Sequence, residues 1–378
     1  MKSLFFSAFK SVKACQKLWT LLMLFSFAMT AAWADSEGKC GDDVTWKYRS
    51  SDSTLIISGT GSTYDYNANT PWHDQQNLSK AIEKVIIEEG ITHIGTWFLG
   101  ALTKVTQISL PEGLISIGSH AFVQCDSLRT ILLPSTLKAL GNNAFSNCRK
   151  LKSLTIPVSV ETIGDWVFHE CPSLESLKVE EGNRIYDSRD NCQAIIETAS
   201  NVLWAGSKNT IIPSSVVGLR KDAFSHKAIA KITIPASLTS IGEYAFFDCT
   251  ELTSITIPRS VTSIGDCAFC GCTRLDTVEV KWPIPLAVPK NTFYRSSKYI
   301  LIVPSGCQFI YEEANPWGEF RHVMDDGEIA GLDPFHTIED KPNASSKTYY
   351  LNGREATNKS EPLMPGLYII RGEKVLIK

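Results

Sequence analysis

The middle of the chain repeats one short pattern of apolar and polar positions. From Ser254 to Ile257 the two kinds of residue alternate, which predicts a β-strand with Ile255 and Ile257 facing inward. Pro258 is expected to end this strand, because proline cannot donate to a ladder of backbone hydrogen bonds. The pattern continues to Gly265, where we expect a turn with positive φ, and then to an Ala-Phe pair that predicts packing on the far side of the core.

This pattern recurs with a period of 23 residues over much of the chain. The glycine position is occupied, in order, by Gly95, Gly118, Gly141, Gly164, Arg220, Gly242 and Gly265. The proline position is occupied by Pro111, Pro134, Pro157, Pro213, Pro235 and Pro258. A fixed period of this length is typical of a solenoid, because one coil cannot bury its apolar positions alone and stacked coils share a core. About nine strands from Val85 to Val280 are expected to form a curved sheet about 40 Å long.

The repeat L-x-x-I-x-I-P-x-S-V-x-x-I-G-x-x-A-F-x-x-C, seen at Leu252 to Cys272, resembles the BspA-like leucine-rich repeat family of bacterial surface proteins. The resemblance covers residues 81–282. It is weaker in the first coil and in the coil at 224–229, which lacks one residue and its cysteine. The resemblance implies a mainly β fold, namely a right-handed curved leucine-rich repeat solenoid of 23-residue coils with β caps. It also implies an adhesin-like role toward host or bacterial surface proteins.

The ends of the chain differ from the repeat. Residues 1–34 contain four lysines, an apolar run and the sequence Ala32-Trp33-Ala34, which together predict a cleaved signal peptide. Residues 35–80 predict a small N-terminal β cap, which would cover the exposed edge of the first coil. Residues 81–282 form the predicted solenoid, and the non-repeating insert at 183–209 predicts a β-hairpin. The insert is interpreted either as a structural feature or as a projecting binding loop.

Three segments are predicted after the solenoid. They are a C-terminal cap with a short helix at 283–325, a polar linker at 326–346, and a β tail at 347–378. The tail is similar to the C-terminal sorting modules of secreted Bacteroidetes proteins, especially in its Gly-Leu-Tyr-Ile-Ile and Lys-Val-Leu-Ile-Lys sequences. A plain β tail without a sorting role is the alternative interpretation.

Composition excludes several classes of protein. The 43% hydrophobic and 20% charged residues are typical of a folded domain, and the net charge of −3 is not that of a nucleic-acid binder. Five cysteines share one repeat position and are interpreted as buried packing residues: Cys125, Cys148, Cys171, Cys249 and Cys272. Parallel side chains would hold their sulfurs too far apart for good disulfide geometry. The sequence Cys267-x-x-Cys270-x-Cys272 lacks the four converging ligands of a zinc site.

Motifs for catalysis and cofactor binding are also absent from the sequence. It contains no H-E-x-x-H, no G-x-S-x-G, no phosphate-binding loop and no dinucleotide fingerprint. His169, beside Glu170, is interpreted as a surface or packing residue of a turn. We therefore predict no enzymatic activity, no cofactor, no metal, no nucleic-acid partner and, after signal cleavage, no membrane span.

The outward positions of the predicted strands are rich in small hydroxyl side chains and carry little net charge. On the expected concave face the candidate partner-binding residues are Gln107, Ser109, Thr130, Thr155, Lys178, Lys231, Thr233, Ser254 and Thr256. Such a shallow strip suits many weak contacts with a protein or a polymer. Serine and threonine are also good exposed strand residues, so the same composition fits a face that binds nothing.

These observations lead to one functional hypothesis and one alternative. The hypothesis is a non-catalytic secreted or cell-surface interaction module that binds extracellular or cell-surface proteins through the concave sheet. The alternative is a carbohydrate-capture surface protein of an outer-membrane uptake system, with glycans as partners. Sugar platforms usually present exposed Trp and Tyr, and the outward strand positions hold neither. The expected location is extracellular or at the outer-membrane surface of a Gram-negative bacterium.

Overall fold

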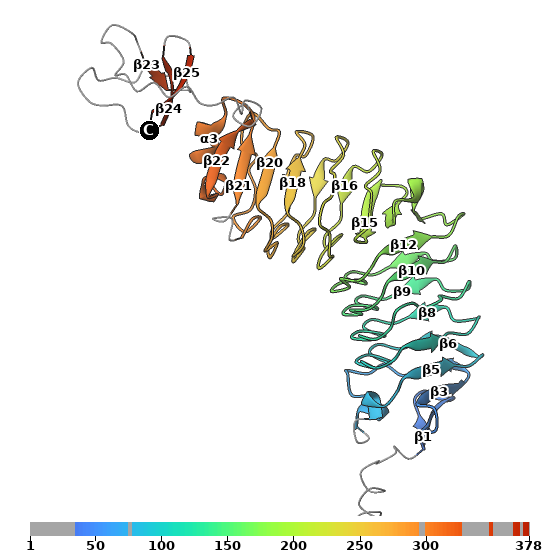
Figure 1. Ribbon diagram of the computed structural model, residues 1–378. Helices are drawn as coiled ribbons and strands as arrows, with labels where there is room; N and C mark the ends of the chain where they lie inside the picture. Colours follow the sequence, from blue (N-terminus) through green and yellow to red (C-terminus); the bar gives the residue numbers. More distant parts are fainter. Residues whose placement is uncertain are drawn as a thin grey trace, which may run out of the picture.

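The computed structural model describes residues 35–74, 78–294 and 299–326, together with the backbone of three strands beyond residue 347. These residues form an elongated stack of coils, built almost entirely of short strands and turns (Figure 1). The predicted signal peptide lies outside the described residues, as does nearly all of the predicted linker.

An antiparallel meander begins the stack, in the region predicted as a cap. Its strands are β1 (Ser36–Lys39), β2 (Val44–Arg49) and β3 (Thr54–Gly59); the short β4 (Gly61–Ser62) that follows pairs in parallel with a strand of the repeat. β3 pairs in parallel with the first repeat strand, so the meander covers the edge of the stack. The two short helical segments that follow are α2 (Pro71–Asp74) and η1 (Leu78–Lys80). Trp46 and Trp72 are buried and meet edge to face, which closes this end of the core.

Each regular coil contributes strands to two parallel ladders. The first ladder contains β5 (Lys84–Ile87), β7 (Gln107–Ser109), β10 (Ser153–Ile156), β12 (Ser176–Val179), β18 (Ser254–Ile257), β20 (Thr277–Val280), β21 (Ile300–Val303) and β22 (His322–Asp325). The second contains β4 and then β6 (Ile91–Ile94), β8 (Ser116–Ile117), β9 (Ala139–Leu140), β11 (Thr162–Ile163), β16 (Gly218–Leu219), β17 (Ser240–Ile241) and β19 (Ser263–Ile264). Equivalent residues pair with one another, as Ile255 does with Val278. Equivalent side chains therefore lie in columns, which confirms the predicted solenoid.

The first ladder is not the continuous sheet of about nine strands that the sequence predicts. Residues 209–212 and 231–234 form no strand, and residues 130–133 contribute only a bridge from Thr130 to Ser153. β12 and β18 consequently belong to different sheets.

The insert interrupts the stack and divides its core. It contains β13 (Tyr186–Asp187), the short helix η2 (Arg189–Asn191), β14 (Ala194–Glu197) and β15 (Val202–Gly206). β14 and β15 form an antiparallel hairpin, and β15 then pairs in parallel with β16. The buried apolar side chains fall into two clusters, one on each side of this hairpin. We call the coils through β12 the first arm and those from β15 onward the second arm; Figure 1 shows a bend between them.

Buried phenylalanines mark the same division. In the first arm Phe122, Phe145 and Phe168 stack with nearly parallel rings, and in the second arm a separate stack runs from Phe224 to Phe293. Phe293 lies beyond residue 282, where the sequence places the end of the solenoid. A further coil follows there, as shown by the Phe293 ring, which stacks 5.0 Å from the Phe269 ring. Phe293 comes 24 residues after Phe269 rather than 23, and this extra residue hides the repeat in the sequence.

The glycine column has a different physical cause from the one predicted. Gly265 and its equivalents do not have positive φ. A Cβ on Gly265 would instead lie 2.3 Å from the backbone nitrogen of Glu243, in the preceding coil. Positive φ is adopted by non-glycine residues of the following turn, such as Asn143 and Asn147. Glycine is therefore required because the coils approach closely at this position.

The C-terminal end of the stack contains α3 (Gln308–Glu312), the short helix η4 (Trp317–Glu319) and the edge strand β22. Where a single short helix was predicted, these are two separate turns. β22 itself was not predicted, and it ends at Asp325, the last residue of the predicted cap. The tail contains β23 (Thr348–Tyr350), β24 (Gly366–Ile370) and β25 (Glu373–Ile377), which pair as an antiparallel sheet.

Candidate functional site: the strand face and the junction

The strand face is the outward surface of the first ladder. All nine predicted partner-binding residues are exposed on it. Six lie on regular strands: Gln107, Ser109, Thr155, Lys178, Ser254 and Thr256. Thr130, Lys231 and Thr233 are exposed in the segments without regular strands. The insert separates the five residues of the first arm from the four of the second, so the structure does not bring them onto one sheet.

Aliphatic side chains stand in the same outward row as these hydroxyl groups. Leu132 is 86% exposed and Ile211 is 76% exposed, while Ile86 is 38% exposed. At the far end of the row the Thr256 hydroxyl donates a 2.7 Å hydrogen bond to the carboxylate of Glu279. The face is therefore a mainly uncharged strip that offers a partner both hydrogen-bonding groups and apolar contacts.

The five cysteines of the repeat column are buried packing residues, which confirms their interpretation. None forms a disulfide. Each thiol donates to a backbone carbonyl of the preceding coil, as Cys148 does to Phe122 and Cys249 does to Phe224. Burial raises the pKa of Cys249 to about 12, so its reactive thiolate form is suppressed.

The Cys270 and Cys272 thiols do not converge, although the Cys267 and Cys270 side chains interact with each other. The Cys270 thiol donates to the Asn291 carbonyl in the following coil, whereas the Cys272 thiol donates to the Phe246 carbonyl in the preceding coil. The two side chains thus satisfy backbone groups on opposite sides of their own coil. Their spacing in the sequence does not create a shared ligand position.

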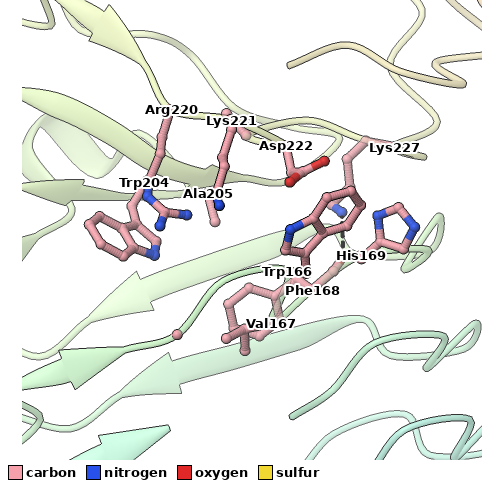
Figure 2. Close-up of a pocket in the computed structure, with 12 residues that line it drawn as sticks. Trp166, Val167, Phe168, His169, Trp204, Ala205, Arg220, Lys221, Asp222 and Lys227 are labelled. Carbon is pink, nitrogen blue, oxygen red and sulfur yellow. Dashed lines mark hydrogen bonds between the residues drawn. The ribbon is translucent and has the colours of Figure 1, made fainter. Parts of the chain in front are cut away.

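A second notable region is the junction, which we define as residues 164–171 of the first arm and 220–227 of the second. At the junction Lys227 takes the repeat position that cysteine occupies elsewhere. Its ammonium group is buried and donates to the Phe168 carbonyl at 2.7 Å (Figure 2). It also donates to the Ser225 carbonyl at 3.1 Å. Phe168 supplies the same carbonyl that a thiol contacts in other coils. The longer lysine side chain therefore makes this contact across the gap between the arms.

Ion pairs also join the two arms at the junction. Arg220 replaces the column glycine, and its guanidinium pairs with Asp165 while lying 3.9 Å from the centre of the Trp204 ring. Lys221 contacts the other oxygen of Asp165 at 2.6 Å. Hydrogen bonds from Lys221 and Arg220 lower the pKa of Asp165. A Cβ is tolerated in the glycine position here because the regular ladder is broken before this coil.

Asp222 lines a small cavity at the junction, together with Trp166, His169 and Lys227 (Figure 2). Both of its carboxylate oxygens are buried and have no hydrogen-bond partner among the described residues. Burial raises the pKa of Asp222 to about 7, even though Lys221 and Arg220 act in the opposite direction. The cavity volume of about 20 Å³ suits a single water molecule and is too small for an organic ligand.

Two histidines from different arms meet beside this cavity. The rings of His169 and His226 are 4.6 Å apart, edge to face. Nε2 of His169 lies 3.6 Å from Glu170 Oε1, and Nδ1 of His226 lies 3.5 Å from Asp248 Oδ2. Sequence analysis interpreted His169 only as a turn residue. Aligning the coils by position could have revealed the cluster, since Glu170, His226 and Asp248 occupy one position in successive coils.

Comparison with known proteins identifies the repeat. The BspA type leucine rich repeat region matches in six copies, over residues 76–193 and 205–315, which is more than half of the chain. The chain belongs to this family. Between the two matched ranges of this BspA-type chain lie residues 194–204, which belong to the hairpin of the insert.

Among the solved structures that resemble this chain, one agrees closely enough to support the fold. A leucine-rich repeat protein from Eubacterium ventriosum is 24% identical, with a TM-score of 0.59, over 77% of this chain and 85% of that one. A leucine-rich repeat protein from Bacteroides ovatus is 20% identical, with a TM-score of 0.46, over 75% of each chain. No curated protein matches the sequence. In the part of the chain that the structure describes, no helix has the length and apolar character needed to cross a bilayer.

Proposed function

We propose that this BspA-type protein is a non-catalytic, adhesin-like interaction module that is secreted or held at the cell surface. It binds host or bacterial surface proteins through the strand face. The observation that carries this proposal is the outward row itself, which combines exposed hydroxyl groups with the strongly exposed Leu132 and Ile211. The signal-like sequence of residues 1–34 supports export of the chain.

The proposed mechanism is reversible contact with a rigid surface. The outward side chains on the regular strands are fixed by buried inward neighbours, as Thr256 is by Ile255 and Ile257. Little backbone freedom is lost when a partner binds such a surface, so weak contacts add to useful affinity. Leu132 and Ile211 would supply apolar contacts, and the surrounding hydroxyl groups would form a polar rim.

Substitution of the strand face tests this proposal. A variant that carries Ser109→Lys, Thr155→Lys, Thr233→Lys and Thr256→Lys adds four charges to the face without altering buried positions. The matched control adds the same charges at exposed positions in turns: Thr103→Lys, Ser214→Lys, Thr250→Lys and Thr273→Lys. Both variants should have the circular dichroism spectrum of the parent chain.

Binding is measured on arrays of bacterial and host surface proteins and, in parallel, on glycan arrays. We expect protein ligands for the parent chain, their loss in the strand-face variant and their retention in the control. Equal binding by both variants would refute the strand face as the site. Binding to glycans alone would favour the carbohydrate-capture alternative.

A further inference from the structure

We propose that the junction binds one divalent transition-metal ion, such as Zn²⁺, through His169, Glu170 and His226, with Asp248 as a fourth ligand. The ion would link the two arms. This site is separate from the strand face, and its existence does not depend on the proposed adhesive function.

The geometry of the three side chains carries the inference. One ligand atom each from His169, Glu170 and His226 can be chosen so that all three lie within 4.8 Å of one another. Ligand atoms around a tetrahedral zinc ion are separated by about 3.3 Å, since each lies about 2.0–2.1 Å from the metal. Small rotations of side chains would bring these atoms to that separation. All three side chains reach solvent in part, so an ion could enter.

Asp248 extends the cluster on the side of the second arm. Its carboxylate lies 3.5 Å from the His226 ring and 38% of its side chain is exposed. It belongs to the coil after His226, whereas the coils of Glu170 and His226 lie on either side of the insert. These three coils present one potential ligand each at the same repeat position, and His169 adds a second imidazole from beside that column.

The charges around the cluster bear on its ability to hold a cation. The buried ammonium of Lys227 is a nearby positive charge that opposes a cation. Two carboxylates, from Glu170 and Asp248, outweigh it. Lys227 is in addition tied to the Phe168 and Ser225 carbonyls.

The donor set selects the kind of ion. Two imidazoles with one or two carboxylates suit Zn²⁺ and the neighbouring first-row metals, whereas Ca²⁺ and Mg²⁺ prefer sites made only of oxygen. The ligands also come from both sides of the divided core, because His169 belongs to the first arm and His226 to the second. A bound ion would therefore act as a cross-link at the place where the phenylalanine stack is interrupted.

Metal titration of the full chain, purified without a polyhistidine tag, tests the proposal. Zn²⁺ binding is followed by calorimetry, and Co²⁺ binding by the visible absorption of a tetrahedral site. We expect one ion per chain with micromolar or tighter affinity, and a higher unfolding temperature in Zn²⁺ than in EDTA. His226→Asn and Glu170→Gln should each weaken binding at least tenfold.

His120→Asn is the matched control. His120 and His226 both have positive φ, which asparagine tolerates, and His120 stacks on Trp97 away from the junction. Its replacement should leave the affinity for zinc unchanged. If His226→Asn fails to fold, Glu170→Gln and the Co²⁺ spectrum of the parent chain decide the question. The proposal is wrong if the parent chain binds no ion below 100 µM or if the control and junction variants bind equally well.

Discussion

The close approach of coils at the glycine column can be tested at Gly141. A Cβ at this position would lie 2.5 Å from the Ser119 nitrogen and 2.6 Å from the Gly118 carbonyl carbon. Both atoms belong to the backbone of the preceding coil, so no flexible side chain can move aside. Gly141→Ala therefore forces the two coils apart by several tenths of an ångström at least.

That displacement acts on contacts that hold the two coils together. The Phe122 and Phe145 rings are stacked 5.1 Å apart, and the Gly141 nitrogen donates to the Ile117 carbonyl at 2.8 Å. Overpacking of an interior typically costs about 1–3 kcal/mol. Because the obstacle is backbone, we expect Gly141→Ala to lower the free energy of unfolding by about 3 kcal/mol, at the upper end of this range. Urea unfolding followed by circular dichroism measures this difference.

Two further variants separate close approach from backbone conformation. Asparagine tolerates positive φ, so Gly141→Asn would destabilise the protein only slightly if a need for positive φ were the reason for glycine. If the reason is the clash with the preceding coil, Gly141→Asn should lower the free energy of unfolding at least as much as Gly141→Ala. Gly61 has a φ of +89°, and no atom lies within 4 Å of the place that a Cβ would occupy. Gly61→Ala should therefore cost only about 1 kcal/mol. A loss below about 0.5 kcal/mol for Gly141→Ala would refute the reasoning.

Three other results are expected. Folding raises the pKa of Asp222, so the native state binds the proton more tightly and the free energy of unfolding should fall as pH rises from about 4 to about 7. Asp222→Asn should remove this pH dependence and raise the free energy of unfolding by about 1–3 kcal/mol at pH 8. An unchanged pH dependence in urea titrations of the variant would contradict this. Ile264→Ala, at a buried ladder position, should cost about 2–5 kcal/mol in urea unfolding, and a loss under 1 kcal/mol would contradict its role in the core. Leu132→Asp and Ile211→Asp should change stability by less than about 0.5 kcal/mol yet reduce partner binding; retained binding on the protein array would exclude an apolar contact there.

Much of the fold could be predicted from sequence because the repeat places equivalent residues in register. The period alone predicts the buried positions of Ile255 and Phe269, the packing of the cysteine column and the stacking of coils. The period does not show why position 265 is glycine, since a need for positive φ and a close approach of the next coil would both select glycine there. It also hides the coil of Phe293, where a single extra residue shifts the frame.

Apart from the repeat position that Glu170, His226 and Asp248 share, the contacts of the junction were beyond sequence analysis for a different reason. The period stops before the insert, so the sequence does not say which residues of the two arms face each other. Lys227 in a cysteine position and Arg220 in a glycine position look like simple departures from the repeat. Only the structure shows that both reach across to the first arm, to Phe168 and Asp165. The nine strand-face residues were correctly expected to be exposed, and their role in binding stays a prediction.

The exchange of cysteine for lysine at position 227 has a consequence for how such proteins can vary. A coil contacts only its neighbours, so a foreign segment placed between two coils disturbs one boundary and leaves the rest of the stack intact. At that boundary the long side chain of Lys227 restores the contact with the Phe168 carbonyl, and Arg220 occupies a position where close packing of coils otherwise allows only glycine. Two local replacements are therefore enough to splice a hairpin into the stack, which makes such boundaries the natural places to graft new loops.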